Sequence, residues 1–242
     1  MPDLGEQALS KIAEVGLSSQ LDAVENLDVT IKTDPGKMLS GAVDSVTVHG
    51  KGMVMQKDLR VEEMQLKTSR IAINPLSVAF GKIELTHPTD AETHVVLTES
   101  DINRALNSEF IREKMQNLRV DVNGTPVTVD TQQLEFGLPG ANKVLLSTNV
   151  VLKAGETKRV SFTAVPRVSP NGQSIALEDV EYLEGKDLSP DLTEAMLNQA
   201  HALLDLQNFE LGEMALRLKT LDVQEGKMVL RAVAHIEQLP TT

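Results

Sequence analysis

The chain has 242 residues, of which 41% are hydrophobic and only 2% aromatic, and its formal net charge is −12. It contains no cysteine, which excludes disulfides, thiolate nucleophiles and Cys-ligated zinc or iron–sulfur sites. The acidic balance argues against nucleic acid as a partner, because phosphates are bound by clustered Lys and Arg. The length suits one domain of residues 1–242, with a core of aliphatic side chains and Met.

No stretch approaches the roughly 18 consecutive apolar residues that a membrane-spanning helix needs. The first residues, Met1–Glu6, are acidic and unlike a secretory leader. We therefore expect a cytoplasmic location, with transient membrane association compatible with it. The sequence does not predict an oligomeric state.

Three segments have the apolar spacing of amphipathic helices. The first starts with a capping-box pattern, Asp3 and Glu6, and its apolar stripe is Leu4, Ala8, Ile12 and Val15. The second begins at Thr98 with Asp101 three residues on, buries Ile102, Ala105 and Leu106, and is interrupted at Asn107-Ser108. The third opens with Ser189-Pro190, and its stripe is Leu192, Met196, Ala200 and Leu203.

Most of the remaining sequence alternates between apolar and polar residues, as strands do. Turn signals separate these runs, at Asn123-Gly124, Pro139-Gly140, Gly155-Glu156, Asn171-Gly172 and Glu225-Gly226. Short connections favour antiparallel neighbours over crossovers. Residues 74–81 are predicted to form one short helical turn. The predicted class is α+β, with long curved antiparallel sheets packed on about three helices.

A short motif recurs at a fixed interval. Glu or Gln, then Asn, then Leu or Phe occurs around Asn26, Asn117 and Asn208, at spacings of 91 residues. Each copy follows a predicted helix and precedes a predicted strand, and Asn suits the left-handed residue that ends a helix. The pattern indicates a pseudo-repeat of helix plus sheet, with units of about 3–97 and 98–188 and a terminal unit 189–242. Coincidence between short motifs is the alternative.

The candidates for chemistry are weak. His87, Asp90, Glu92 and His94 form the densest group of possible metal ligands, but Pro88-Thr89-Asp90 is typical of a hairpin turn in water, so we predict no metal site. Gly50-Lys51-Gly52 lacks the following helix of a phosphate loop, and its glycines indicate a bulge or a close approach of strands. His49, His201 and His235 have no evident partners. We predict no catalytic residue, no cofactor and no enzymatic activity.

Several stretches resemble the LmeA-like phospholipid-binding family over nearly the whole chain, and the cyanobacterial branch most. They are Val43–Gly52, Met55–Val61, Ile73–Leu76, Val96–Ala105 and Phe162–Arg167. The resemblance implies a curved antiparallel sheet wrapped around helices, which encloses an apolar tunnel as in tubular (TULIP-type) lipid-binding proteins. It implies phospholipid or another acyl-chain lipid as the partner, and non-catalytic binding or transfer as the function.

Candidates for such a site follow from the strand pattern. The predicted lipid-lining residues are Met53, Met55, Val160, Phe162, Ala164, Leu216, Leu218, Met228 and Leu230. The predicted head-group residues are Lys51, Lys57 and Arg60. They lie in residues 32–82, which carry eight basic and five acidic side chains within an acidic protein. A solvated sheet face explains the same charges.

Two other functions stay open. One is a protein-interaction or scaffold domain with a completely filled core, in which the acidic surface and strand edges bind a partner. The other is a hydrolase or another enzyme, which would require two or more of His87, Asp90, Glu92 and His94 to converge in a cleft.

Overall fold

The computed structural model describes residues 4–38, 40–55, 59–79, 83–109, 112, 118–122, 125–152, 157–184 and 214–238. The chain forms two compact units. The first consists of Met1–Leu97, Glu210–Thr220 and Leu230–Thr242, and the second of Thr98–Phe209 and Leu221–Val229. In the described part of the chain, no helix is both long enough and apolar enough to cross a membrane.

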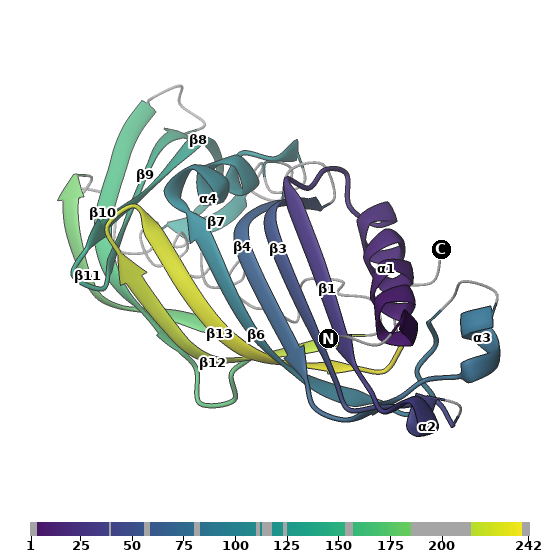
Figure 1. Ribbon diagram of the computed structural model, residues 1–242. Coiled ribbons are helices and arrows are strands. Elements are labelled where there is room, and N and C mark those ends of the chain that lie inside the picture. Colours follow the sequence, from purple (N-terminus) through teal and green to yellow (C-terminus); the bar gives the residue numbers. More distant parts are fainter. Residues whose placement is uncertain are drawn as a thin grey trace. The chain divides into compact units, whose positions relative to one another are not determined.

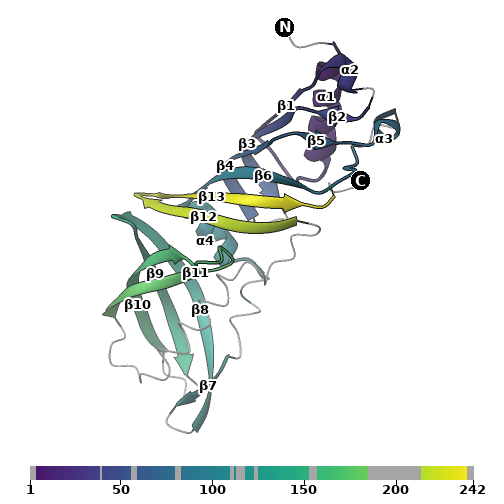
Figure 2. The same ribbon diagram turned by 90° about the horizontal axis from the view of Figure 1, so that it is seen from below.

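The first unit is built on a six-stranded sheet, in which β13 and β12 lie side by side next to β6 (Figures 1 and 2). In sheet order its strands are β1 (Asn26–Lys32), β3 (Ser45–Met55), β4 (Leu59–Thr68), β6 (Thr89–Thr98), β13 (Lys227–Ile236) and β12 (Met214–Gln224). The smaller elements are α1 (Leu4–Ser19), α2 (Pro35–Met38), α3 (Pro75–Ala79) and the pair β2 (Ala42–Val43) and β5 (Ile71–Ala72). Helix α3 confirms the short helical turn predicted for residues 74–81.

The second unit contains a five-stranded sheet and helix α4 (Glu99–Leu106). In sheet order its strands are β11 (Ile175–Glu184), β10 (Thr157–Val168), β9 (Lys143–Leu152), β8 (Thr125–Gly140) and β7 (Leu118–Val122). The strand pairs with a determined register, in both units, are antiparallel. The predicted α+β class, mostly antiparallel sheet with about three helices, is confirmed.

Helix α1 runs along the outer side of edge strand β1 (Figure 1). The Ile31 N–H donates to Ser10 Oγ at 3.0 Å, and the Thr33 N–H donates to Glu6 Oε1 at 2.8 Å. Leu9, one residue from Ser10, is 2% exposed and belongs to the apolar core. One side of the helix, with Glu6 and Ser10, therefore binds the strand edge, and the adjacent side, with Leu9, packs in the core.

The apolar stripe predicted for this helix was wrong. Ala8 is exposed and Val15 is 60% exposed, whereas Leu9, Ala13 and Leu17 pack in or against the core. Two overlapping stripes at helical spacing are available in this sequence. Hydrogen bonding of Glu6 and Ser10 to β1 selects the stripe that buries Leu9.

Helix α4 also lies against the edge of a strand, β8, and forms hydrogen bonds with its backbone. It begins as predicted, because the Thr98 side chain caps the Asp101 N–H while the Asp101 side chain accepts from the Thr98 N–H. Its last residue is Leu106, and Asn107, the predicted interruption, is its C-cap. Ile102, Ala105 and Leu106 are half-buried. The predicted continuation through Phe110, Ile111 and Met115, and the third helix at 189–203, lie outside the described residues.

Polar side chains four residues apart on α4 bind alternate backbone positions of β8. Glu99 Oε2 accepts from the Leu138 N–H at 2.7 Å. Asn103 accepts from the Phe136 N–H at 2.9 Å and donates to the Phe136 carbonyl at 2.7 Å. Asn107 does the same for Leu134, at 3.2 and 2.8 Å. Strand β7 pairs with β8 only at Thr125–Val129, so α4 satisfies the edge that β7 does not reach.

One predicted turn and one predicted helix end differ in the structure. The turn between β8 and β9 is Ala141-Asn142 rather than Pro139-Gly140, because Ala141 and Asn142 both adopt positive φ (52° and 56°) and Gly140 still pairs with Lys143. Asn26 was predicted to end a helix just before a strand. It is instead the first residue of β1, and the preceding helix, α1, ends at Ser19. Gly172 and Gly226 occupy the other two predicted turns with φ of 73° each. Asn117, Asn208, Asn123-Gly124 and Gly155-Glu156 all lie outside the described residues.

Candidate functional site

One face of the first unit's sheet is apolar and aliphatic. Its sealed part is a cluster of side chains that are at most 8% exposed: Leu9, Val29, Ile31, Val43, Val48, Ile71, Ile73, Leu85, Ala91, Ala234 and Ile236. Leu9 of α1 closes this cluster over the strands. Aliphatic side chains of this kind make a smooth apolar surface without ring edges or polar tips.

The same face continues along the strands beyond this cluster. Gly50 of β3 pairs with Met64 of β4, and Met64 pairs with Val95 of β6. The Met53 side chain lies where a side chain on Gly50 would stand, because its sulfur is 2.0 Å from the ideal Cβ position of Gly50. Gly50 therefore makes room for the Met53 side chain, and Gly52 makes room for the Glu25 side chain.

We call these residues the Met53 patch: Met53, Met64, Leu66, Thr93 and Val95. Met64, Leu66 and Val95 are half-buried, in contrast to the sealed cluster beside α1. Methionine adapts its shape to irregular or changing neighbours more readily than branched side chains. The patch is thus the adaptable part of this apolar face.

The lining candidates on β3, β12 and β13 other than Met53 differ in their exposure. Leu218 is 4% exposed and Met228 7% exposed, while Met55, Leu216 and Leu230 are half-buried. Leu216 packs against the sealed cluster. Met53, Met55, Leu216, Leu218 and Leu230 belong to the first unit, whereas Met228 belongs to the second.

The remaining lining candidates form the buried face of the second unit's sheet. Val160, Phe162 and Ala164 alternate along β10 and are 3%, 6% and 0% exposed. Phe162 pairs with Leu146 on one side and with Tyr182 on the other, and the two rings are 5.8 Å apart between centroids. The opposite face of β10 is buried too, since Ser161 and Ser147 share a hydrogen bond of 2.7 Å.

The predicted head-group residues are not equivalent. Lys51 is exposed and pairs across the sheet with Glu63. Arg60 forms ion pairs with Glu25 at 3.0 Å and with Glu62 at 2.8 Å. The Glu25 side chain lies where a side chain on residue 52 would stand, so Gly52 leaves room for this ion pair. Lys57 lies outside the described residues. An anionic group would have to displace carboxylates from Arg60.

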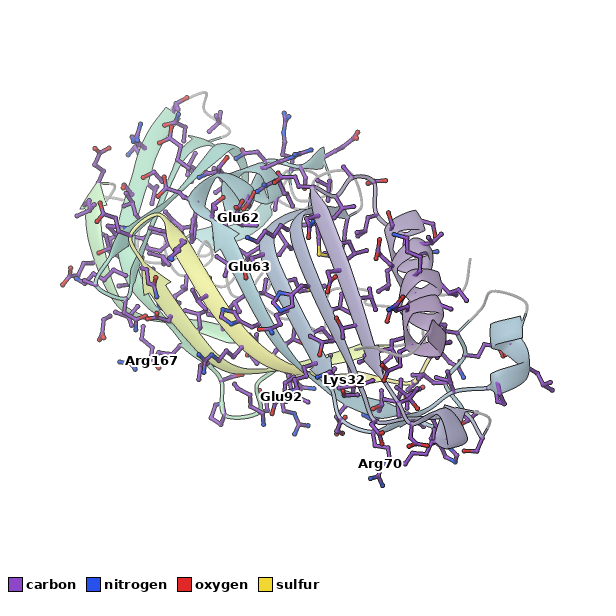
Figure 3. The ribbon with its side chains drawn as sticks, in the orientation of Figure 1. Lys32, Glu62, Glu63, Arg70, Glu92 and Arg167 are labelled. Carbon is purple, nitrogen blue, oxygen red and sulfur yellow. The ribbon has the colours of Figure 1, made fainter. Side chains whose placement is uncertain are left out.

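The other face of the first unit's sheet is polar. One row across four strands consists of Asp28, His49, Gln65 and His94, and His49 is hydrogen-bonded to Gln65 at 2.9 Å. Lys67 pairs with Glu92, and Glu63 and Glu92 both lie on this sheet (Figure 3). Such a face is stabilised by cross-strand pairs and by water.

The histidine cluster does not assemble. Asp90 binds His235 at 2.7 Å, so His235 has a partner that the sequence did not indicate, and His87 contacts the neighbouring Thr86. Within the described residues no group of three His, Cys, Asp or Glu side chains could hold a metal ion. His201 lies outside the described residues.

The clearest electrostatic perturbation lies on the second unit's surface. The Lys143 ammonium donates to Glu181 at 2.9 Å, and this hydrogen bond and its charge lower the pKa of the Glu181 carboxyl. Both side chains are exposed, so the pair has the character of a surface ion pair rather than of a reactive site.

Sequence reasoning missed four members of the patch. Met64 and Leu66 alternate within β4 and could have been found from that alternation. Thr93 and Val95 were overlooked because the neighbouring even-numbered residues, Asp90, Glu92 and His94, suggested a ligand cluster. The odd-numbered face of β6 is the buried one.

A model of the LmeA-like phospholipid-binding family matches residues 3–233 of this sequence. The chain belongs to this family. No curated protein and no solved structure matches the chain. The resemblance seen in the sequence is thereby confirmed for nearly the whole chain. Membership of the LmeA-like phospholipid-binding family supports a lipid as the partner and points to binding rather than catalysis.

Proposed function

We propose that this protein binds a phospholipid, or another lipid with acyl chains, without catalysing a reaction on it. The acyl chain would lie on the Met53 patch, in the apolar tunnel that the sequence resemblance implies. Transfer of the lipid between membranes during transient contact is the corresponding cellular role. The observation that carries the proposal is the family match over residues 3–233.

The chemistry of the patch supports this ligand. Apart from Thr93, its side chains are aliphatic or thioether, and three of them, Met64, Leu66 and Val95, are only half-buried. Each methylene removed from water contributes roughly 0.8 kcal/mol, so ten methylenes of an acyl chain would contribute about 8 kcal/mol. Affinity of that size needs few polar contacts.

The described residues offer fewer contacts to a lipid head group than to an acyl chain. Lys51 of β3 is exposed, and its ammonium group is in contact with water. Arg60 becomes available only if Glu25 or Glu62 is displaced. We therefore expect the acyl chains to determine affinity and the head group to change it only modestly.

The test is lipid uptake by the purified full chain. The protein is incubated with vesicles of phosphatidylglycerol or phosphatidylcholine, separated from them, and weighed by native mass spectrometry. We expect a one-to-one complex with a diacyl lipid that survives separation. A mass equal to that of the bare chain after both incubations would refute lipid binding and favour the scaffold alternative.

A pair of alanines on one strand locates the bound chain. Ala234 belongs to the sealed cluster, and Ala232 is two residues along the same face of β13, at 6% exposure. Ala234→Leu should destabilise the fold by about 1–3 kcal/mol through overpacking. Ala232→Leu should cost less stability and should reduce lipid uptake, because the added side chain takes the place of lipid methylenes. Equal destabilisation at both positions, with unchanged uptake, would show that this face is filled by protein.

A further inference from the structure

Thr93 carries a buried hydroxyl without a hydrogen-bond partner. The residue is 8% exposed, and its Oγ1 has no hydrogen-bond partner among the residues that the structure describes. Six other Ser and Thr residues among those described are equally buried, and each has a partner: Thr33, Thr68, Ser77, Ser147, Thr148 and Ser161. A buried polar group that lacks a partner destabilises the fold, so its retention calls for an explanation.

The surroundings of this hydroxyl are aliphatic. Across the sheet, Val29 pairs with Val48, Val48 with Leu66, and Leu66 with Thr93. Ala91, the residue before Thr93 on the same face of β6, is fully buried. Valine has the same shape as threonine and would complete this row without a polar atom.

The only unsatisfied hydroxyl in this set thus stands within the Met53 patch. Its counterpart on the neighbouring strand is different: Thr68 accepts from the Val46 N–H at 3.0 Å and is satisfied by the protein itself. Thr68 pairs with Ala91 across the same strands, so the two threonines occupy comparable positions. The contrast identifies Thr93 as the position where the protein does not supply the partner.

We infer that the Thr93 hydroxyl donates a hydrogen bond to the acyl carbonyl oxygen of the bound lipid. This inference rests on the proposed function. A carbonyl oxygen is an acceptor joined directly to an acyl chain, so it can reach an aliphatic surface together with the methylenes that bind there. A phosphate would have to give up its hydration beside Leu66 and Ala91, which is costly for a charge. A water molecule needs two or more polar partners, and the side chains in the row that ends at Thr93 are the aliphatic ones of Val29, Val48 and Leu66.

The inference distinguishes lipids by the presence of the carbonyl. A diacyl phosphatidylglycerol and its dialkyl ether analogue have the same head group and nearly the same chains, but the ether lacks the acceptor. The full chain should prefer the ester by about threefold to tenfold in a competition measured by native mass spectrometry. A free fatty acid of the same length tests whether a carboxyl oxygen can replace the ester.

Three variants separate ligand binding from folding. Thr93→Val should lose the ester preference while it unfolds at the same or a higher temperature. Thr93→Ser, which keeps the hydroxyl, should retain the preference. Thr68→Val, the matched control, should keep the preference and unfold about 2–4 °C lower, because it leaves the Val46 N–H unsatisfied.

The outcomes are distinct for the inference and for the proposed function. If the unmodified chain takes up no lipid, both fail. If it takes up lipid and Thr93→Val keeps the same ester preference, only the inference fails. A lower unfolding temperature for Thr93→Val would also overturn the inference, because it would show that the hydroxyl has a partner within the protein.

Discussion

Two helices of this protein, α1 and α4, each satisfy the free edge of a strand, and they use different side chains to do so. On α1, Glu6 and Ser10 accept hydrogen bonds from two N–H groups of β1. On α4, Asn103 and Asn107 each bind both the N–H and the carbonyl of a β8 residue. In both cases the polar side chains are four residues apart and meet alternate strand residues in reverse order.

A helix can replace a neighbouring strand when its side chains offer the hydrogen-bonding groups that the strand would have offered. A strand edge offers an N–H and a carbonyl at every second residue. An asparagine amide matches both groups, because it contains one acceptor and one donor. A hydroxyl or carboxylate held against the N–H matches one of them. We expect the β8 edge to depend more strongly on its helix than the β1 edge does.

The largest expected effect is that of Asn103→Ala. It leaves the Phe136 N–H and carbonyl without their partner, and we expect a loss of about 2 kcal/mol in the free energy of unfolding, measured by urea denaturation. Amide exchange of Phe136 should accelerate. Asn149→Ala is the control, since that half-buried side chain forms no hydrogen bond with the described residues. An Asn103→Ala loss no larger than the control's would mean that water serves the edge equally well.

A smaller effect is expected for Ser10→Ala. Only the Ile31 N–H loses its acceptor, so the loss should be about 1 kcal/mol, with faster exchange at Ile31 and unchanged exchange at Phe136. Leu9 keeps α1 in the apolar core. If Ser10→Ala and Asn103→Ala lower the free energy of unfolding equally, a side chain that binds both the N–H and the carbonyl of a strand residue stabilises the edge no more than one that binds the N–H alone.

The smallest effect concerns a surface pair of the second unit, which lacks the burial of the helix–edge contacts. In Lys143→Met, the pKa of Glu181 should rise toward its ordinary value, as followed by NMR of the side-chain carboxyl carbon. Because the folded pKa is lowered, the pair stabilises the fold above the unfolded pKa, and that contribution disappears as the pH falls through the folded pKa. Unchanged titration of Glu181 in the variant would show that Lys143 is not the cause.

Local patterns allowed much of the fold to be predicted. The Thr98–Asp101 capping box, the turn at Gly226 and the strand alternation depend on residues close together in sequence, and they were found. The stripe of α1 was wrong because its choice depends on β1, about 21 residues away from Ser10 in sequence. The contacts of Asn103 with Phe136 span 33 residues, and no local rule contains them.

In the candidate site, too, some residues could be predicted from local sequence patterns and others could not. Met53 was predicted from its position in an alternating strand, and the structure places it over Gly50 on the apolar face. The importance of Thr93 depends on the absence of a partner, which only three-dimensional neighbours reveal. The sequence around it is dominated by charged and imidazole side chains that face the other way. The spacing of Glu99, Asn103 and Asn107 can be read from the sequence, but the β8 backbone groups that they bind cannot.

The hairpin of β12 and β13 is shared between the two units, since its ends belong to the first and residues 221–229 to the second. During synthesis, neither unit can be completed until this hairpin has left the ribosome. Both would wait unfinished with apolar strands exposed, a state in which chains readily aggregate. Removing residues from 214 onward should therefore disable both units together, and a chaperone that shields the nascent chain would have most of the protein to protect.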